Sequence, residues 1–185
     1  MKKLPVLIFA LVALAQLSVP ALMAWTRVQT LAHGRVWKFK TAPIDPEDAM
    51  RGRYVRLSYD VDRFTGSEKF QPGDSVYAVL KENADGFAEV DRITNKNVGG
   101  DNSVKVQAWW SNDRENIAFP FNQYWVTERD APAAEKAYAE NSRRGQQNAF
   151  VTVRMHNGDA ALEQLYINNQ PLRDYLRAQA EAAKK

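Results

Sequence analysis

Residues 53–61, which read RYVRLSYDV, predict the fold more directly than any other stretch of the chain. Apolar and polar side chains alternate along them, and alternate residues of a strand point to opposite faces of a sheet. We therefore predict a strand with one buried face and one face that is at least partly exposed. The apolar face carries Val55, Leu57, Tyr59 and Val61, of which the first three are expected in the core, and the other face carries Tyr54, Arg56, Ser58 and Asp60.

Similar short strands are predicted on both sides of this segment. Turn signals separate them, of which Asn83-Ala84-Asp85-Gly86 and Asn157-Gly158 are the clearest hairpin signals. Residues 111–116 are expected to form a polar loop, and Pro120 makes the last aromatic strand a bent strand or an edge strand. The predicted strands are residues 36–41, 75–82, 87–94, 103–110, 117–126, 150–155 and 161–167.

An uncharged stretch of 22 residues, 4–25, follows Lys2 and Lys3 at the N-terminus. As a helix it would be about 33 Å long, enough for the hydrocarbon core of a bilayer. Its apolar residues lie all round the helix, and Trp25 suits the membrane–water interface. We predict a transmembrane helix that contacts the lipid bilayer through residues 4–25 and continues to about residue 32, with Gly34 as its stop.

Two alternatives to an uncleaved signal anchor are open. One is a buried core helix of a soluble protein. The other is a signal peptide that ends at Val19-Pro20-Ala21 or Leu22-Met23-Ala24, although the apolar run is longer than a usual signal core. Lys2 and Lys3 favour a cytoplasmic tip, and long domains cross the membrane largely regardless of their charge. We expect a single pass through a bacterial inner (plasma) membrane, with the body in the periplasm or outside the cell.

Helix signals in the body are few. Residues 131–144 are rich in Ala, Glu, Lys and Arg, which favour a helix, and Pro132 and Gly145 mark its two ends. The fold class that follows is α+β, mainly antiparallel β, with an N-terminal transmembrane helix and one sandwich or barrel-like domain with one body helix. The expected divisions are a tip, anchor and stalk at 1–34, the β-rich domain at 35–171, and a polar tail at 172–185, helical and frayed.

The composition excludes several classes of protein. The chain has no Cys, which excludes a disulfide scaffold and a zinc–thiolate site. The formal charge of +3 includes Lys2 and Lys3. Without these two, the body has 23 basic and 22 acidic residues. Because the body is nearly neutral, we predict no nucleic-acid partner. We also predict no cofactor and no metal site.

The candidate binding face surrounds the strand at 53–61. Arginine binds carboxylate or phosphate through two parallel hydrogen bonds, and tyrosine adds a flat contact. An architectural alternative is that Asp45 caps a short helical turn, that Gly52 reverses the chain, and that the arginines pair with nearby carboxylates. The residues of this candidate face are Asp45, Asp48, Arg51, Gly52, Tyr54, Arg56 and Tyr59.

The same stretch resembles the motif of the GDYXXLXY family. The motif here is Gly52-Arg53-Tyr54-Val55-Arg56-Leu57-Ser58-Tyr59, preceded by Asp45-Pro46-Glu47-Asp48 and by Arg51. Arg53 stands where the family motif has Asp, so no role of that Asp is carried over. The resemblance implies a membrane-associated β-rich protein without an assigned activity, one that accompanies multi-pass membrane proteins.

An aromatic run precedes the predicted helix. It allows two interpretations, stacking on a sugar or peptide, or a core with an aromatic belt near the lipid surface. Its members are Trp109, Trp110, Phe119, Phe121, Tyr124 and Trp125.

Residues suited to catalysis are scarce. A Ser-His-Asp triad would have to use His33 or His156, and neither lies near a recognisable nucleophile in the sequence. We therefore predict a binding or accessory module that partners another membrane protein of the cell envelope. The alternative is a hydrolase that acts on cell-envelope polymers.

Overall fold

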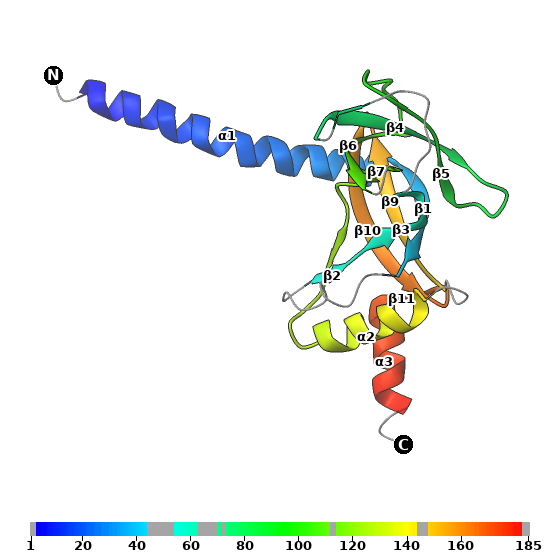
Figure 1. Cartoon of the computed structure of the whole chain (residues 1–185). Helices are drawn as coiled ribbons and strands as arrows, with labels where there is room; N and C mark the ends of the chain where they lie inside the picture. Colours follow the sequence, from blue (N-terminus) through cyan, green and yellow to red (C-terminus); the bar gives the residue numbers. More distant parts are fainter. Residues whose placement is uncertain are drawn as a thin grey trace.

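The computed structural model describes residues 3–43, 54–62, 70–71, 73–111, 114–143 and 148–182. Helix α1 (Lys3–His33) projects from the body as a long arm (Figure 1). Among the described residues it is the one helix long and apolar enough to cross a membrane, and its most apolar part is not buried at all. A core helix of a soluble protein would be mostly buried, which α1 is not.

The end of α1 is fixed to the body at Gly34. The Gly34 N–H donates to the Thr30 carbonyl oxygen at 2.9 Å, and Thr30 itself is only 2% exposed. A Cβ atom at position 34 would lie 2.4 Å from the Thr30 oxygen and 2.8 Å from the Met155 oxygen. The helix stops before Gly34, as predicted. Glycine also allows it to end directly against the sheet, and the chain enters the first strand without a linker.

The first sheet contains five strands in the order β11-β10-β9-β1-β3, and each neighbouring pair is antiparallel. The strands are β1 (Arg35–Ala42), β3 (Ser58–Tyr59), β9 (Ala149–His156), β10 (Asp159–Ile167) and β11 (Gln170–Pro171). Asn157 and Gly158 have φ angles of 51° and 91°, so the predicted β9–β10 hairpin has a turn with two left-handed residues.

A second sheet has the order β5-β4-β6-β7, and β2 and β8 form a separate two-stranded pair. These strands are β2 (Tyr54–Arg56), β4 (Ser75–Glu82), β5 (Ala88–Thr94), β6 (Ser103–Ser111), β7 (Arg114–Ala118) and β8 (Gln123–Trp125). An isolated bridge between Val104 and Gly158 links β6 to the β9–β10 turn. The predicted fold class, α+β and mainly antiparallel β with an N-terminal apolar helix, is confirmed.

The core lies where the sheets face one another, and aromatic rings fill part of it. The Phe39 ring is fully buried and lies 5.1–5.6 Å, between centroids, from the rings of Tyr59, Phe119 and Phe121. Aromatic pairs at such distances and tilted angles contribute beyond the burial of their area. Two of the predicted aromatic run, Phe119 and Phe121, therefore belong to the core.

Two helices lie together at one end of the β body (Figure 1). They are α2 (Ala131–Asn141) and α3 (Leu172–Ala182), and α3 lies within the tail predicted at 172–185. Leu172 is 1% exposed, so α3 is packed on the body at its first residue. The two helices are far apart in the sequence, and only the fold brings them together.

Three local predictions differ from the structure. The segment 53–61 is not one strand, because β2 pairs with β8 and β3 pairs with β1, after which Asp60–Asp62 form a 3₁₀ turn. The polar loop predicted at 111–116 contains the start of β7. The aromatic segment 117–126 is divided between β7 and β8 by a turn around Pro120, which cannot donate to a sheet ladder.

Candidate functional site

The second half of the motif is structural. Tyr59 is 3% exposed, and its hydroxyl donates to the Phe121 carbonyl oxygen at 2.6 Å. Its ring packs against Phe39, Phe119 and Phe121. A buried tyrosine needs such a partner for its hydroxyl, and here the bond ties β3 to the turn between β7 and β8.

Leu57 marks the point at which the chain passes from one sheet to another. It is 4% exposed and its N–H donates to the Asn122 carbonyl oxygen at 2.8 Å, next to the β2–β8 pair. One residue later the Ser58 N–H donates to the Tyr138 hydroxyl of α2 at 3.4 Å, and that hydroxyl donates to the Ala42 carbonyl oxygen at 3.0 Å. The motif therefore connects β1, β8 and α2.

The first half of the motif carries the outward face. Tyr54 is half-buried, and its ring lies 5.3 Å from the Trp125 ring across the β2–β8 pair. Arg56 is exposed and lies opposite Gln123. Trp125 is 66% exposed, which is unusual for so large a side chain. Of the candidate residues predicted from sequence, Tyr54 and Arg56 face outward and Tyr59 does not.

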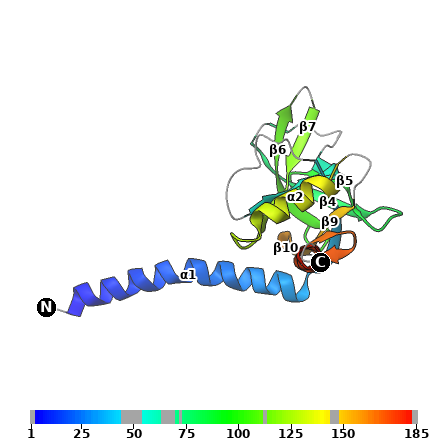
Figure 2. The ribbon, with the colours of Figure 1, turned by 90° about the horizontal axis from the view of Figure 1, so that it is seen from below.

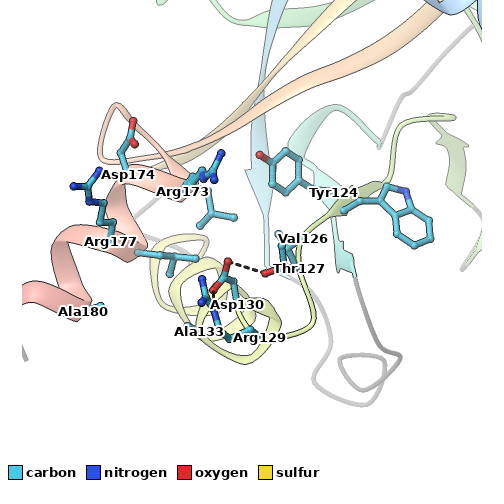
Figure 3. A pocket seen from close by; sticks show the side chains of 13 residues that line it. Tyr124, Val126, Thr127, Arg129, Asp130, Ala133, Arg173, Asp174, Arg177 and Ala180 are labelled. Atoms are coloured by element: carbon cyan, nitrogen blue, oxygen red, sulfur yellow. Dashed lines mark hydrogen bonds and ion pairs between the residues drawn. The ribbon is translucent and has the colours of Figure 1, made fainter.

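A groove begins at Trp125 and runs between β8, α2 and α3 (Figure 3). Its volume is about 1140 Å³. Apolar side chains from all three elements line it, and five charged side chains lie among them. The apolar residues include Tyr124, Trp125, Val126, Ala133, Leu172, Leu176 and Ala180, and the charged residues are Arg129, Arg173, Arg177, Asp130 and Asp174.

The electrostatics of the groove differ between its two walls. At the start of α2, the Asp130 carboxylate accepts a hydrogen bond from the Thr127 hydroxyl at 2.7 Å and one from Arg129 Nε at 3.2 Å. These two bonds lower the pKa of Asp130. On the β8 side, burial raises the pKa of the Tyr124 hydroxyl, although hydrogen bonds with Gln164 and the Leu165 backbone oppose the shift. Asp130 therefore stays ionised and Tyr124 stays neutral near pH 7.

Sequence reasoning missed this groove. Arg173 and Arg177 are four residues apart, a spacing that places two helical residues on one face, and that was the available signal. Arg129 and Asp130 come from a distant part of the chain, so their proximity to α3 depends on the fold. Four predicted site residues lie outside the described residues: Asp45, Asp48, Arg51 and Gly52.

The residues of the aromatic run differ in where the structure places them. Phe119 and Phe121 are buried, at 2% and 4% exposure. Tyr124 and Trp125 line the groove. The side chains of Trp109 and Trp110 lie outside the described part of the structure. The run therefore combines core residues with residues of an exposed aromatic rim.

The two histidines meet where α1 joins the body. Their ring centroids are 6.3 Å apart, and His156 Nδ1 lies 3.0 Å from Asp101 Oδ1. The other ring nitrogen of His156, Nε2, lies 3.1 Å from Asn157 Nδ2. Within the described ranges, no three His, Cys, Asp or Glu side chains are placed to hold a metal ion.

The chain joins a β-rich body, without a linker, to an N-terminal helix that is long and apolar enough to span a membrane. It is therefore a protein of the class that carries a β-rich domain on an N-terminal apolar helix. The chain matches the model of the GDYXXLXY protein family over residues 16–165, and it belongs to that family. None of the curated proteins and none of the solved structures compared with the chain matches it.

Proposed function

We propose that this protein is a membrane-anchored binding module whose body lies outside the cytoplasm and holds a second membrane protein. One observation carries the proposal. The exposed apolar helix α1 ends directly on the body at Gly34, where no Cβ atom would fit. A domain joined in this way to a membrane helix has a fixed place beside the bilayer, where it meets the extramembrane segments of neighbouring membrane proteins.

The groove between β8, α2 and α3 is the proposed binding site. It combines an apolar lining with three arginines and two aspartates. Arg129 and Arg177 contact Asp130 and Glu181, whereas Arg173 makes no ion pair within the described residues. A polypeptide segment with an apolar residue and a carboxylate would satisfy both features, because arginine binds carboxylates through two bonds.

The hydrolase alternative would depend on the His156–Asp101 pair. A carboxylate that orients a histidine is one part of a catalytic triad. Here, however, the second ring nitrogen lies against Asn157 Nδ2, so the geometry of the described residues does not direct it at a hydroxyl. Release of soluble fragments from envelope polymers by the purified chain, lost on His156→Ala, would favour the hydrolase instead.

Membrane attachment and topology have a direct test. Membranes that contain the full chain are washed at high salt and alkaline pH, and intact cells with a permeabilised outer layer are treated with protease. We expect the chain to stay with the membranes and the body to be digested from outside. Recovery of a soluble chain that begins near Leu22 or Trp25 would show a cleaved signal peptide and overturn the anchor.

Partner binding is tested by photocrosslinking in the native membrane. A benzoylphenylalanine residue replaces Ala180, which lines the groove, or Ala178, which is exposed on the same helix but does not line it. We expect an adduct with an integral membrane protein from position 180 and much less from position 178, and we expect Arg173→Ala to reduce the first adduct. Equal adducts at both positions would exclude the groove as the binding site.

A further inference from the structure

We propose that the body rests on the surface of the bilayer that α1 spans, with Trp125 and Arg129 in contact with anionic lipid headgroups. This inference rests on the proposed function, because it requires that α1 stay in the membrane. It adds a second membrane contact, far from α1 in the sequence, and it fixes the groove at the level of the headgroups.

The boundary of the membrane on α1 follows from its side chains. Residues 4–25 carry no charge, Trp25 is 64% exposed, and the first charged residue after them is Arg27. Tryptophan is enriched at the membrane–water interface, and arginine marks the polar side of it. From Trp25 to His33 the helix rises only about 12 Å further, so the body begins close to the headgroups.

The junction holds the body in one orientation. A Cβ atom at Gly34 would collide with the backbone oxygens of Thr30 and Met155, and Arg154 Nη1 donates to the Gly34 carbonyl oxygen at 3.3 Å. A flexible linker would allow the body to turn freely, but β1 starts at Arg35, immediately after the glycine. The surface that faces the membrane is therefore set by the fold.

Figures 1 and 2 identify that surface. In both views the body extends sideways from the axis of α1, and the turn from β8 into α2 lies on the side toward the N-terminus of α1. The β4–β5 hairpin points to the opposite side in both views. With α1 across a bilayer, the β8–α2 turn faces the headgroups and the β4–β5 hairpin faces away.

The side chains on this turn suit a lipid surface. Among the side chains that the structure describes outside α1, three large hydrophobic ones are exposed: Val36 at 42%, Val98 at 50% and Trp125 at 66%. An exposed indole has a favourable position at the headgroup level, where its ring is apolar and its N–H is polar. Four residues further along the chain, the Arg129 side chain is 91% exposed.

Arg129 supplies the attraction to anionic lipid. Its contact with Asp130 is made through Nε at 3.2 Å and is an exposed ion pair, a kind that contributes little to stability. A lipid phosphate offers charge-assisted hydrogen bonds to the guanidinium without a rearrangement of the core. Basic side chains close to the surface of an anionic membrane are attracted within about a Debye length.

The experiment uses the absence of Cys from the chain. Gln123→Cys places a unique thiol on the exposed face of β8, two residues from Trp125, and Asp85→Cys places one on the β4–β5 hairpin. Each full-length variant is labelled with a fluorophore and reconstituted in vesicles of phosphatidylcholine and phosphatidylglycerol. The vesicles carry a nitroxide quencher on a fraction of their headgroups. We expect several-fold stronger quenching of the label at 123 than of the label at 85.

Second variants identify the side chains responsible. We expect Trp125→Ala and Arg129→Ala, each in the Gln123→Cys background, to reduce the quenching toward the level of position 85 while the thermal midpoint stays the same. We also expect removal of phosphatidylglycerol, or added salt, to weaken the quenching. Equally weak quenching at positions 123 and 85 would overturn the proposed contact, and quenching that does not depend on phosphatidylglycerol would overturn its anionic selectivity.

The outcomes separate this inference from the proposed function. If the label at 123 is not quenched but position 180 still crosslinks to a membrane protein, the lipid contact is wrong and the binding module stands. If quenching at 123 falls when a crosslinked partner occupies the face, then that face belongs to the protein partner and the lipid contact is overturned. If the chain leaves the membrane on alkaline washing, the anchor itself fails.

Discussion

The motif has an inner set of side chains, which includes Val55, and an outer set, and the two sets have opposite environments although their residues alternate in the chain. Leu57 and Tyr59 are buried, and the Tyr59 hydroxyl is bonded to the backbone of a neighbouring turn. Tyr54 and Arg56 lie on the outward face of β2, where Tyr54 packs against the exposed Trp125. The inner set therefore joins the sheets, and the outer set forms part of a surface next to the groove.

The difference teaches that a motif that recurs in a family can combine architecture with an exposed face. The leucine and the final tyrosine of the motif hold the crossing between two sheets, which is a structural reason for their identity. Changes in the two sets should therefore affect different properties, stability for the inner set and binding for the outer set. Three substitutions in the motif test the comparison, and a fourth tests the rim of the groove beside it.

The largest effect is expected from Leu57→Ala. Leu57 is 4% exposed at the crossing between β2 and β3, so truncation leaves a cavity that the two sheets cannot easily close. Core truncations of this kind cost about 2–5 kcal/mol in the free energy of unfolding. Denaturant unfolding of the detergent-solubilised chain measures it, and a loss no larger than that of a surface substitution would show that the crossing is not part of the core.

Tyr59→Phe should have the next largest effect. The substitution keeps the ring among Phe39, Phe119 and Phe121 but leaves the buried Phe121 carbonyl oxygen without its donor. An unsatisfied buried polar group costs about 1–3 kcal/mol, and the same unfolding experiment measures the loss. Unchanged stability would mean that water or another donor replaces the hydroxyl.

Arg56→Ala should change stability little. Arg56 is exposed on the outward face of β2, and surface substitutions usually stay within about 0.5 kcal/mol. If the outward face takes part in binding, the same variant should reduce the position 180 adduct while its thermal midpoint is unchanged. A stability loss equal to that of Leu57→Ala would instead place Arg56 in a structural ion pair and contradict the division of the motif.

The smallest effect is expected at the rim of the groove. Thr127→Ala removes the hydroxyl that hydrogen-bonds to the Asp130 carboxylate, so the pKa of Asp130 should rise toward its ordinary value. A lowered pKa stabilises the folded state above the ordinary value of 3.8, and this contribution is lost as the pH falls through the lowered pKa. Carboxyl titration by NMR measures the shift, and an unchanged pKa would assign the effect to Arg129 alone.

Much of the fold could be predicted because local signals agree with the tertiary structure. The predicted strand at 75–82 matches β4, and Asn157-Gly158 forms the expected hairpin turn because both residues accept positive φ angles. The burial of Val55, Leu57 and Tyr59 was also correct, because alternation along a strand is a property of the backbone.

The errors lie where a segment changes partners. Residues 53–61 keep their alternation, but hydrogen bonds to β8 end at Arg56 and those to β1 begin at Ser58. The alternation of apolar and polar residues indicates which side chains are buried, but it does not indicate which strand pairs with the segment. It therefore predicted one strand where the structure has two. The expectations for Asp45, Asp48, Arg51 and Gly52 remain predictions, because these residues lie outside those described.

The sequence by itself determined the apolar arm, the β-rich body and the membership of the motif in its family, because each depends on residues close together in the chain. Only the tertiary structure decided that Trp125 is exposed, that α2 and α3 both line the groove, and which arginine side chains lie in it. The groove joins residues 124–133 with residues 172–180, and their proximity comes from the packing of β8, α2 and α3. No local pattern encodes a contact between segments that only the folded sheets bring together.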